Sequence, residues 1–491
     1  MINIGSSSFI IAIPEIYLVI VAFLLLLLGL FTKVQDTETK VLLFNRVSSL
    51  SVIAIIFGFI LVYAIGDMYV ETFHSLFIIS PIIFLFKLVI IFFVLIIAIL
   101  SRLYLIDKSI HQFEYIVLML FFLVGNLLMI SSNDFIAFYV TLELTTVCTY
   151  ILMFMDKKDI PSIQAGIKYF LLGVLGTAFL LYGISLVYGY TGLTNFTEIR
   201  SVVDSDTKNW VLLIGIVMIL VGIGFKLSLV PFHMWTPDVY KGVNKFVLLM
   251  LSVVSKFSIF FILIRILWEP FGGVISQWQQ IVVLLIVLSA LIGFIVSIYQ
   301  TNIKSFIAYS SIANMSYMLM IALSPSVIAV KNLIIFSLSY GIALVGFVGT
   351  LMLFKRDNKS IVDIYDLKGL YKNHPYLAFI LSTFLISMAG LPITAGFFGK
   401  IFVLYSVFTS EYYLLGALLA LLSVVMMYFY LKVIKIMYFD SYEDVAINFY
   451  AIKGNFLAKF TLGFLFLFTV LFIVFLVPLI RVLEEVITFL F

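Results

Sequence analysis

The stretch Gly224-Phe-Lys-Leu-Ser-Leu-Val-Pro-Phe-His-Met-Trp-Thr-Pro-Asp238 decides how this chain folds. An apolar run that starts at Trp210 leads into it, so Lys226 falls near the middle of a predicted membrane-crossing helix. A lysine at the centre of a bilayer costs about 2.5–3.5 kcal/mol. Pro231 follows five residues later and interrupts the helical hydrogen bonds. Because broken backbone in a membrane is tolerated only inside protein or beside a watery cavity, the stretch indicates an ion pathway.

The composition predicts an integral membrane protein of the all-α class. The chain has 491 residues, of which 64% are hydrophobic and 11% are charged, whereas soluble domains average about 25% charged residues. The single cysteine, Cys148, excludes an internal disulfide and a cysteine cluster for zinc or iron–sulfur. His74, His111 and His374 fall in predicted loops without metal-site spacing, and we find no nucleotide-binding loop. Residues 9–31 are too long for a signal-peptide core and are predicted as the first span.

Apolar runs predict about fourteen transmembrane helices. They cover residues 9–31, 47–66, 80–104, 114–131, 133–155, 163–190, 209–235, 246–268, 277–300, 303–323, 328–354, 376–408, 411–439 and 457–481. Asn133-Asp134 and Thr301-Asn302 fill the two shortest turns, as hairpin residues commonly do.

The loops predict the orientation of the chain. One alternating set of loops carries 17 lysines and arginines, and the other carries four. By the positive-inside rule the first set faces the cytoplasm or the mitochondrial matrix. Both termini then lie on the opposite side, which requires an even number of spans.

Two predicted spans are interrupted in the same way. The seventh contains Pro231, and the twelfth contains Pro392 followed by Gly396-Phe-Phe-Gly-Lys400. Paired interrupted helices at matching positions indicate an inverted repeat, here of two five-helix units. The expected divisions are three N-terminal helices at 1–113, a first repeat at 114–268, a second and inverted repeat at 269–440, and a loop with the last helix at 441–491.

Four charged side chains fall inside predicted spans: Glu143, Lys226, Lys256 and Lys400. Left isolated, they would cost on the order of 12 kcal/mol. One interpretation is that Glu143 forms a purely structural ion pair with one lysine, but this leaves two lysines unexplained. The other interpretation is a proton relay, since a buried lysine can exchange protons near neutral pH.

Other polar residues near the spans have simpler interpretations. His233 either bonds to the broken backbone or passes protons from Lys226 towards the central axis. Lys87 lies near a predicted membrane edge, where it is expected to snorkel, and Lys304 is expected to anchor the basic surface. Asp134 is expected to cap the helix that follows it.

The motifs resemble those of one family. The similar stretches are Gly224 to Gly242, Asn133-Asp134 with Leu142-Glu143-Leu144, Ala165 to Gly173, Ser255-Lys256, Asn302 to Ala313, Gly390-Leu-Pro392 and Gly396 to Lys400. Together they resemble the antiporter-like membrane subunits of respiratory complex I, and most closely the subunit N group, which is called subunit 2 in mitochondria. Two features favour that group: Lys256 follows a serine, and the stretch Phe225 to Val230 precedes Pro-Phe-His.

The resemblance implies that Glu143, Lys226, Lys256 and Lys400 carry protons through the middle of the membrane, coupled to quinone reduction elsewhere in the complex. It implies no redox cofactor in this chain, with FMN, iron–sulfur clusters and quinone held by partner subunits. The implied partners are other complex I membrane subunits and lipids, and the implied location is the mitochondrial inner membrane, with a bacterial plasma membrane as the alternative. Two competing functions are a cation/proton antiporter subunit and a structural subunit that does not pump.

The chain departs from the family pattern at two places. Asn244-Lys245-Phe246 stands where the family usually has a Pro-x-Pro turn, and Lys245 is expected to add a surface charge. Asn314 stands where a histidine is usual. Asparagine binds water but does not titrate, so a histidine-mediated step is not expected there.

Overall fold

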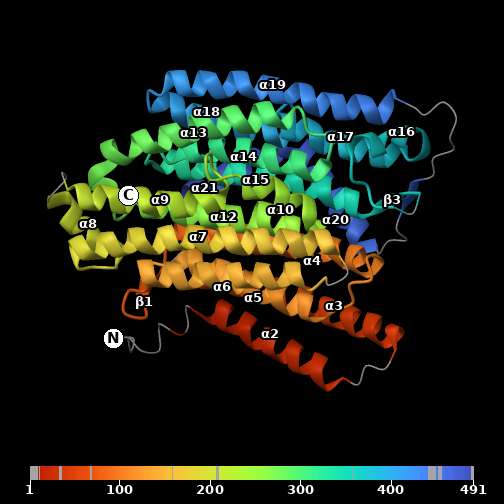
Figure 1. The fold of residues 1–491 in the computed structure, drawn as a ribbon, viewed down its shortest axis with the longest axis horizontal. Coiled ribbons are helices and arrows are strands. Elements are labelled where there is room, and N and C mark those ends of the chain that lie inside the picture. The colour runs from red at the N-terminus through yellow and green to blue at the C-terminus, as the bar shows by residue number, and fades with distance from the viewer. Residues whose placement is uncertain are drawn as a thin grey trace.

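Long helices run side by side through the molecule, from α2 at one edge to α19 at the other (Figure 1). The structure is a computed structural model that describes residues 9, 12–32, 36–66, 69–156, 159–205, 209–357, 359–440, 449–451 and 456–487. Five lysines that contributed to the predicted orientation lie outside these residues: Lys33, Lys157, Lys158, Lys208 and Lys453.

The first half of the chain runs from α2 to α12. Its elements are α2 (Ile13–Phe31), α3 (Thr37–Ile65), β1 (Val70–Thr72), β2 (Phe77–Ile79), α4 (Pro81–Asp107), α5 (Glu114–Ser131), α6 (Phe135–Phe154), α7 (Ile160–Thr191), α8 (Phe196–Ser205), α9 (Trp210–Leu227), α10 (Trp235–Gly242), α11 (Lys245–Leu249), the π-helix η1 (Met250–Ser255) and α12 (Lys256–Trp268). The helices α11, η1 and α12 follow one another without a gap as one span.

The second half of the chain runs from η2 to α21. Its elements are the 3-10 helix η2 (Gly272–Val274), α13 (Ile275–Ser297), α14 (Ile303–Ile321), α15 (Val327–Met352), β3 (Phe354–Arg356), the 3-10 helix η3 (Ile364–Leu367), α16 (Leu370–Asn373), α17 (Pro375–Ala389), α18 (Ala395–Thr409), α19 (Tyr413–Tyr438), β4 (Phe449–Ala451), α20 (Phe456–Val470) and α21 (Phe472–Ile487).

The described residues contain eleven helices that are long and apolar enough to cross a bilayer. The helices α20 and α21 are bent by 83° at their junction and would add one span if counted together. The all-α membrane class is therefore confirmed, while the number of fourteen stays a prediction. The bend after Val470 was not predicted, since residues 457–481 form one uninterrupted apolar run.

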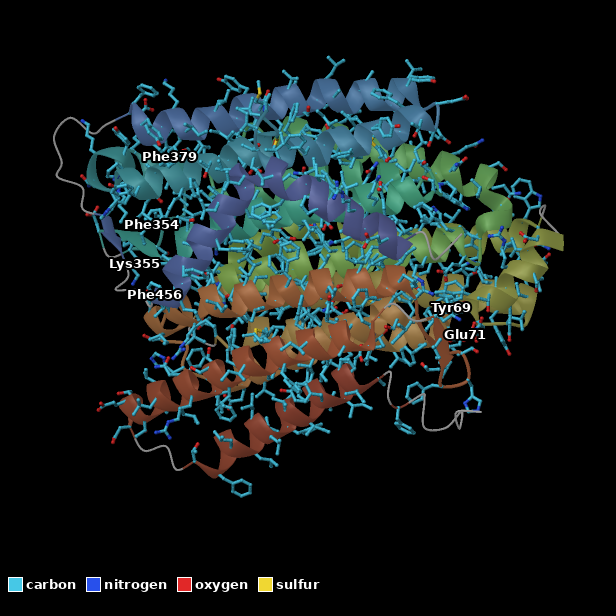
Figure 2. The ribbon with its side chains drawn as sticks, turned by 180° about the vertical axis from the view of Figure 1, so that it is seen from behind. Tyr69, Glu71, Phe354, Lys355, Phe379 and Phe456 are labelled. Carbon is cyan, nitrogen blue, oxygen red and sulfur yellow. The ribbon has the colours of Figure 1, made fainter. Side chains whose placement is uncertain are left out.

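Two short antiparallel strand pairs lie at opposite ends of the helix bundle (Figure 1). Strand β1 pairs with β2, and β3 pairs with β4 from the distant C-terminal region. Figure 2 shows Glu71 of β1 and the preceding Tyr69 at one end of the bundle, and Phe354 and Lys355 of β3 at the other end. The end with β3 also carries α16 with Lys372 (Figure 1), in agreement with the predicted basic face.

Small residues let α7 and α9 pack closely. A side chain built at Gly222 of α9 would lie 2.6 Å from Leu180 Cβ and 2.9 Å from the Gly176 carbonyl oxygen of α7. Within a membrane, such close packing replaces the hydrophobic effect as the force that holds helices together.

We therefore expect Gly222→Val to separate α7 from α9 and to destabilise the protein by about 1–3 kcal/mol. The measurement is the midpoint of thermal unfolding of the purified protein. Gly189→Ala in α7 is the matched control, because nothing lies within 4 Å of the added carbon. Equal midpoints for the two variants would contradict the packing argument.

Candidate functional site

Lys226 lies in the last turn of α9 with its side chain buried. Its Nζ donates to Thr146 Oγ1 of α6 at 3.0 Å and lies 5.7 Å from the centre of the Tyr169 ring. Glu143 precedes Thr146 by three residues, so it occupies the same face of α6 one turn away. In the part of the chain that the structure describes, Glu143 forms no salt bridge and its Oε1 accepts no hydrogen bond. The static ion pair that the sequence offered as one interpretation is therefore not formed.

The helix break that positions Lys226 begins at Ser228, three residues before Pro231. Ser228 has a left-handed backbone with φ 62°, and Leu229 N donates to the Gly224 carbonyl at 2.8 Å. The Phe225 carbonyl accepts the Trp235 indole N–H at 2.9 Å, and Val230 N donates to Ser289 Oγ at 2.9 Å. Side chains thus satisfy backbone groups that the break releases, as a membrane interior requires.

His233 lies in the turn between α9 and α10 and is buried. Its Nδ1 makes no hydrogen bond within the described residues. Thr236 and Tyr240 follow at intervals of three and four residues, and their hydroxyl oxygens are also without partners there. These three side chains form a polar face that extends from the turn at His233 along α10.

Lys256 is the first residue of α12, directly after the π-helix η1. Its Nζ donates to Ser311 Oγ of α14 at 2.9 Å and lies 5.6 Å from the centre of the Tyr240 ring. The side chain is 1% exposed, and no carboxylate lies within salt-bridge distance of it among the described residues. A neutral hydroxyl and an aromatic face therefore hold this ammonium group.

Lys400 belongs to α18, just beyond the second break. Its Nζ donates to the carbonyl oxygens of Met388 at 3.1 Å and Ala389 at 2.9 Å, the last two residues of α17. The C-terminal end of a helix carries partial negative charge, so it stabilises a cation there.

The second break lies between Ala389, where α17 ends, and Ala395, where α18 begins. Gly390 follows α17 directly with a left-handed backbone, φ 81°, and Pro392 comes two residues later. The structure thus interrupts the helix around Pro392, where the sequence places the break.

Aromatic and polar side chains connect the three lysines. The Tyr169 ring beside Lys226 lies 4.8 Å from Trp235, and Trp235 lies 6.4 Å from the Tyr240 ring beside Lys256.

On the other side of Lys256, α14 carries Ser311 and Asn314 on successive turns. A small cavity of about 10 Å³ is lined by Asn314, Tyr340 and Lys400. Lys226, Lys256 and Lys400 thus belong to one continuous internal line, with Glu143 beside its first member.

Lys245 was expected at the surface, and this prediction is wrong. Its side chain is buried, with Nζ donating to the Leu351 carbonyl and lying 5.8 Å from the centre of the Tyr104 ring. The preceding Asn244 caps the helix by accepting from Val247 N at 3.0 Å. The chain therefore starts this span with a capped helix and encloses Lys245 between α4 and α15.

Lys87 does not snorkel to a membrane edge, so that prediction is also wrong. Its Nζ lies 2.6 Å from Glu15 Oε1, and both side chains are 5% exposed. The partner is 72 residues away in the sequence, on α2. The sequence offered no means of pairing these two side chains.

The expected cap at Asp134 is confirmed, because its Oδ1 accepts from Ile136 N at 2.7 Å and from Ala137 N at 3.3 Å.

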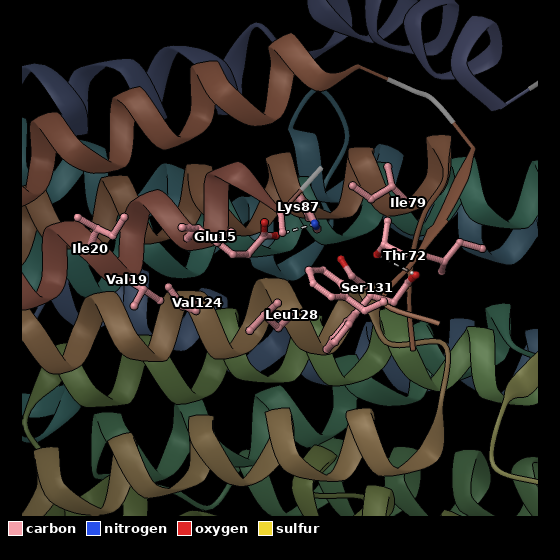
Figure 3. Close-up of a pocket in the computed structure, with 14 residues that line it drawn as sticks. Glu15, Val19, Ile20, Thr72, Ile79, Lys87, Val124, Leu128 and Ser131 are labelled. Atoms are coloured by element: carbon pink, nitrogen blue, oxygen red, sulfur yellow. Dashed lines mark hydrogen bonds and ion pairs between the residues drawn. The ribbon is translucent and has the colours of Figure 1, made fainter. Parts of the chain in front are cut away.

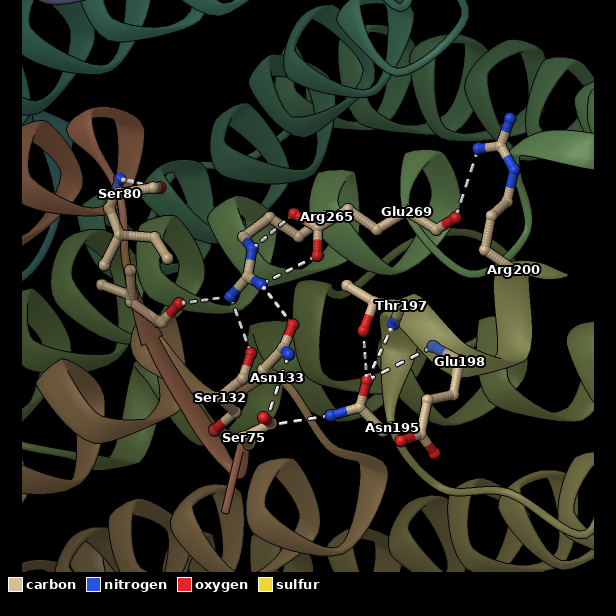
Figure 4. A network of polar contacts seen from close by, with 12 residues as sticks. Ser75, Ser80, Ser132, Asn133, Asn195, Thr197, Glu198, Arg200, Arg265 and Glu269 are labelled. Carbon is tan, nitrogen blue, oxygen red and sulfur yellow. Dashed lines mark hydrogen bonds and ion pairs between the residues drawn. The ribbon is translucent and has the colours of Figure 1, made fainter. Parts of the chain in front are cut away.

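Arg265 is a buried charge that the sequence patterns described above did not predict (Figure 4). Its guanidinium group donates to the carbonyl oxygens of Ile130 at 3.0 Å and Ser132 at 2.7 Å, and to both oxygens of Glu269 at 2.8 Å. It also donates to Asn133 Oδ1 at 3.2 Å. This network fixes α12 to the turn between α5 and α6. An arginine inside an apolar run, four residues before a glutamate, was the available signal.

The described residues contain no group of three or more His, Cys, Asp or Glu side chains that could hold a metal ion. The chemistry that the line of lysines supports is the movement of protons between nitrogen and oxygen atoms.

Comparison with known proteins identifies the family. Residues 132–426 match the family described as NADH:quinone oxidoreductase/Mrp antiporter, TM. NADH-quinone oxidoreductase subunit N of Paramagnetospirillum magneticum is 36% identical over 433 residues, which cover 87% of this chain and 88% of the relative. The chain belongs to the NADH:quinone oxidoreductase/Mrp antiporter family. Subunit N of Pelagibacter ubique is also 36% identical, over 88% of this chain and 90% of the relative.

Solved structures share the fold of this family member. A chain of respiratory complex I from Thermus thermophilus superposes with a TM-score of 0.77 at 24% identity, covering 93% of this chain and 97% of its own length. A chain of the Mrp complex from Dietzia sp. superposes with a TM-score of 0.80 at 17% identity, covering 97% and 96%.

We expect Arg265→Met to destabilise the protein by about 1–3 kcal/mol, because it leaves the buried carbonyl oxygens of Ile130 and Ser132 without their donors. The midpoint of thermal inactivation of the purified complex should fall clearly. Lys435→Met is the matched control, since that side chain is 68% exposed and its pair with Asp440 is 4.0 Å long. A midpoint for Arg265→Met equal to that of the control would show that the network adds no stability.

Proposed function

We propose that Glu143, Lys226, Lys256 and Lys400 form the proton relay of a membrane-arm subunit of NADH–quinone oxidoreductase. The observation that carries the proposal is the continuous line of three buried lysines, each held by neutral partners. The curated relatives are named as subunit N of that enzyme, which supports coupling of this relay to quinone reduction elsewhere in the complex.

Neutral partners suit a relay better than tight ion pairs. A lysine in a buried salt bridge leaves an uncompensated carboxylate when it loses its proton, at a cost of several kcal/mol. A hydroxyl or carbonyl partner loses only one hydrogen bond when the same proton leaves. Thr146 and Ser311 serve Lys226 and Lys256 in this way, and the end of α17 serves Lys400. Glu143, one helical turn from Thr146 on α6, adjusts the proton affinity of Lys226.

The step from Lys256 to Lys400 runs along α14. Ser311 accepts from Lys256, and Asn314 lines the small cavity that reaches Lys400. Its volume of about 10 Å³ is close to the minimum for one water molecule. Asn314 can orient such a water through its amide group but cannot carry the proton itself. The hydroxyl of Tyr340, which has no hydrogen-bond partner among the described residues, provides a second polar group at this cavity.

His233 is the proposed branch of the relay near Lys226. The unpartnered atoms of His233, Thr236 and Tyr240 follow α10 from the break towards the ring that faces Lys256. Water bound along this face would join the two lysines beside the aromatic contact of Tyr169 with Trp235.

The arrangement of the helices supports an inverted repeat of two five-helix units. In the first unit α7 packs against α9 and α10, and in the second unit α15 packs against α17 and α18. The third helix of each unit therefore contacts both halves of a broken helix. Three further spans can be added to the eleven long apolar helices: α14, the pair α17–α18 and the pair α20–α21. The sum would be the predicted fourteen spans.

The proposed setting is a complex with other antiporter-like membrane subunits and surrounding lipid. FMN, iron–sulfur clusters and quinone would belong to partner subunits. The curated relatives named above are bacterial, which favours a bacterial plasma membrane over the mitochondrial inner membrane that was expected from the resemblance.

The second candidate function is cation/proton antiport. The favouring observation is the fold shared with the Mrp complex chain. Vesicles that hold the purified complex and carry an imposed pH gradient, without NADH, separate the two functions. Sodium movement that follows the imposed gradient and that a protonophore abolishes would favour the antiporter, whereas its absence would favour the proton relay.

We expect Lys226→Ala to lower the number of protons moved per electron, because proton passage through this chain should fall at least roughly tenfold, a barrier increase of about 1.4 kcal/mol. The purified complex is reconstituted in vesicles, and protons moved per electron are measured. Lys168→Ala is the matched control, because its pair with Asp238 is exposed. Unchanged stoichiometry in an intact Lys226→Ala complex would favour the structural, non-pumping alternative.

We expect Asn314→Leu to slow pumping, because an aliphatic side chain removes the polar lining between Lys256 and Lys400. Asn314→His restores a side chain that binds water and also titrates, so it should keep pumping near the wild-type rate. Both rates are measured in the same vesicles. Full activity of Asn314→Leu would place the proton path elsewhere.

A further inference from the structure

An apolar cavity of about 330 Å³ lies beside α2, far along the sequence from the line of lysines (Figure 3). Helices α2, α4 and α5 and the strands β1 and β2 contribute to its wall. Its lining includes Ile16, Val19, Ile20, Val124 and Leu128. Ile16 and Ile20 are 39% and 52% exposed, so the cavity continues onto the outer surface of α2.

The ion pair of Glu15 and Lys87 stands in this apolar wall. Glu15 Oε1 accepts from Lys87 Nζ, while Glu15 Oε2 is buried and accepts no hydrogen bond from the described residues. An ionised carboxylate accepts on both oxygens, and buried acceptors are almost always paired. The free oxygen therefore calls for a hydrogen-bond donor from a bound molecule.

The pair lies close to the boundary between hydrocarbon and lipid headgroups. Lys87 follows Pro81, the first residue of α4, by six residues, or about 9 Å along the helix. The 27 residues of α4 extend about 40 Å, whereas the hydrocarbon core is about 30 Å thick. If the excess is shared between both ends, the pair sits about 4 Å inside the hydrocarbon boundary.

We propose that this cavity binds a phospholipid whose headgroup donates a hydrogen bond to Glu15 Oε2. The apolar lining accommodates an acyl chain, and an apolar cavity is a poor site for water alone. The donor is either a primary ammonium, as in phosphatidylethanolamine, or a hydroxyl, as in phosphatidylglycerol. Phosphatidylcholine has neither donor and cannot satisfy the carboxylate. The site is separate from the proton relay and does not depend on it.

The test uses the purified complex with photoactivatable phosphatidylethanolamine, phosphatidylglycerol or phosphatidylcholine, each with a diazirine on the acyl chain. Mass spectrometry then locates the labelled peptides. We expect at least one donor lipid to label peptides containing Ile16, Ile20 or Val124 roughly tenfold more than phosphatidylcholine. That factor corresponds to about 1.4 kcal/mol. Which donor lipid labels distinguishes an ammonium from a hydroxyl.

Two variants separate the cavity from the ion pair. Val19→Phe fills the cavity and should abolish its labelling, while Ile53→Phe, on an exposed face of α3, should not. The double variant Glu15→Leu with Lys87→Met removes both charges and the acceptor together and should abolish the preference for donor lipids. Equal labelling by all three lipids in the wild-type complex would overturn the proposal, as would labelling that Val19→Phe leaves unchanged.

Discussion

Every buried cation in this membrane protein needs partners, and this constraint organises the structure. The helix breaks supply some of them directly, since the end of α17 provides two carbonyl oxygens for Lys400. Hydroxyl groups on neighbouring helices supply others, as Ser311 does for Lys256. Arg265 takes its partners from the turn between α5 and α6. The positions of these helices are thus tied to the positions of the charges.

The buried cations differ in their partners, and Lys245, which is held by the Leu351 carbonyl and the Tyr104 ring, shows that neutral partners also occur outside the line of lysines. Lys87 and Arg265 have carboxylate partners, and both lie outside the line that joins Lys226 to Lys400. The three lysines in that line have neutral partners and a tyrosine ring within about 6 Å each. Full charge compensation suits a side chain that fixes the fold. Partial compensation suits a side chain that changes its protonation state.

The sequence was sufficient to predict the membrane class, the two breaks and the burial of Lys226, Lys256 and Lys400. Those predictions depend on the cost of charge in hydrocarbon and on proline chemistry, which act locally. The pairing of Lys87 with Glu15 and the burial of Lys245 depend on contacts between distant segments, so a single sequence does not reveal them. The first break begins at Ser228 because the backbone turns left-handed there, before Pro231 is reached.

The π-helix η1 determines where Lys256 points. A π-turn contains one more residue than an α-turn, and one residue of an α-helix corresponds to a rotation of roughly 100°. If Met250–Ser255 were α-helical, the residues beyond it would be rotated relative to Lys245 by about that angle. Lys256 would then face a different neighbour from Ser311. The direction of this ammonium group is therefore encoded in the winding of the backbone just before it.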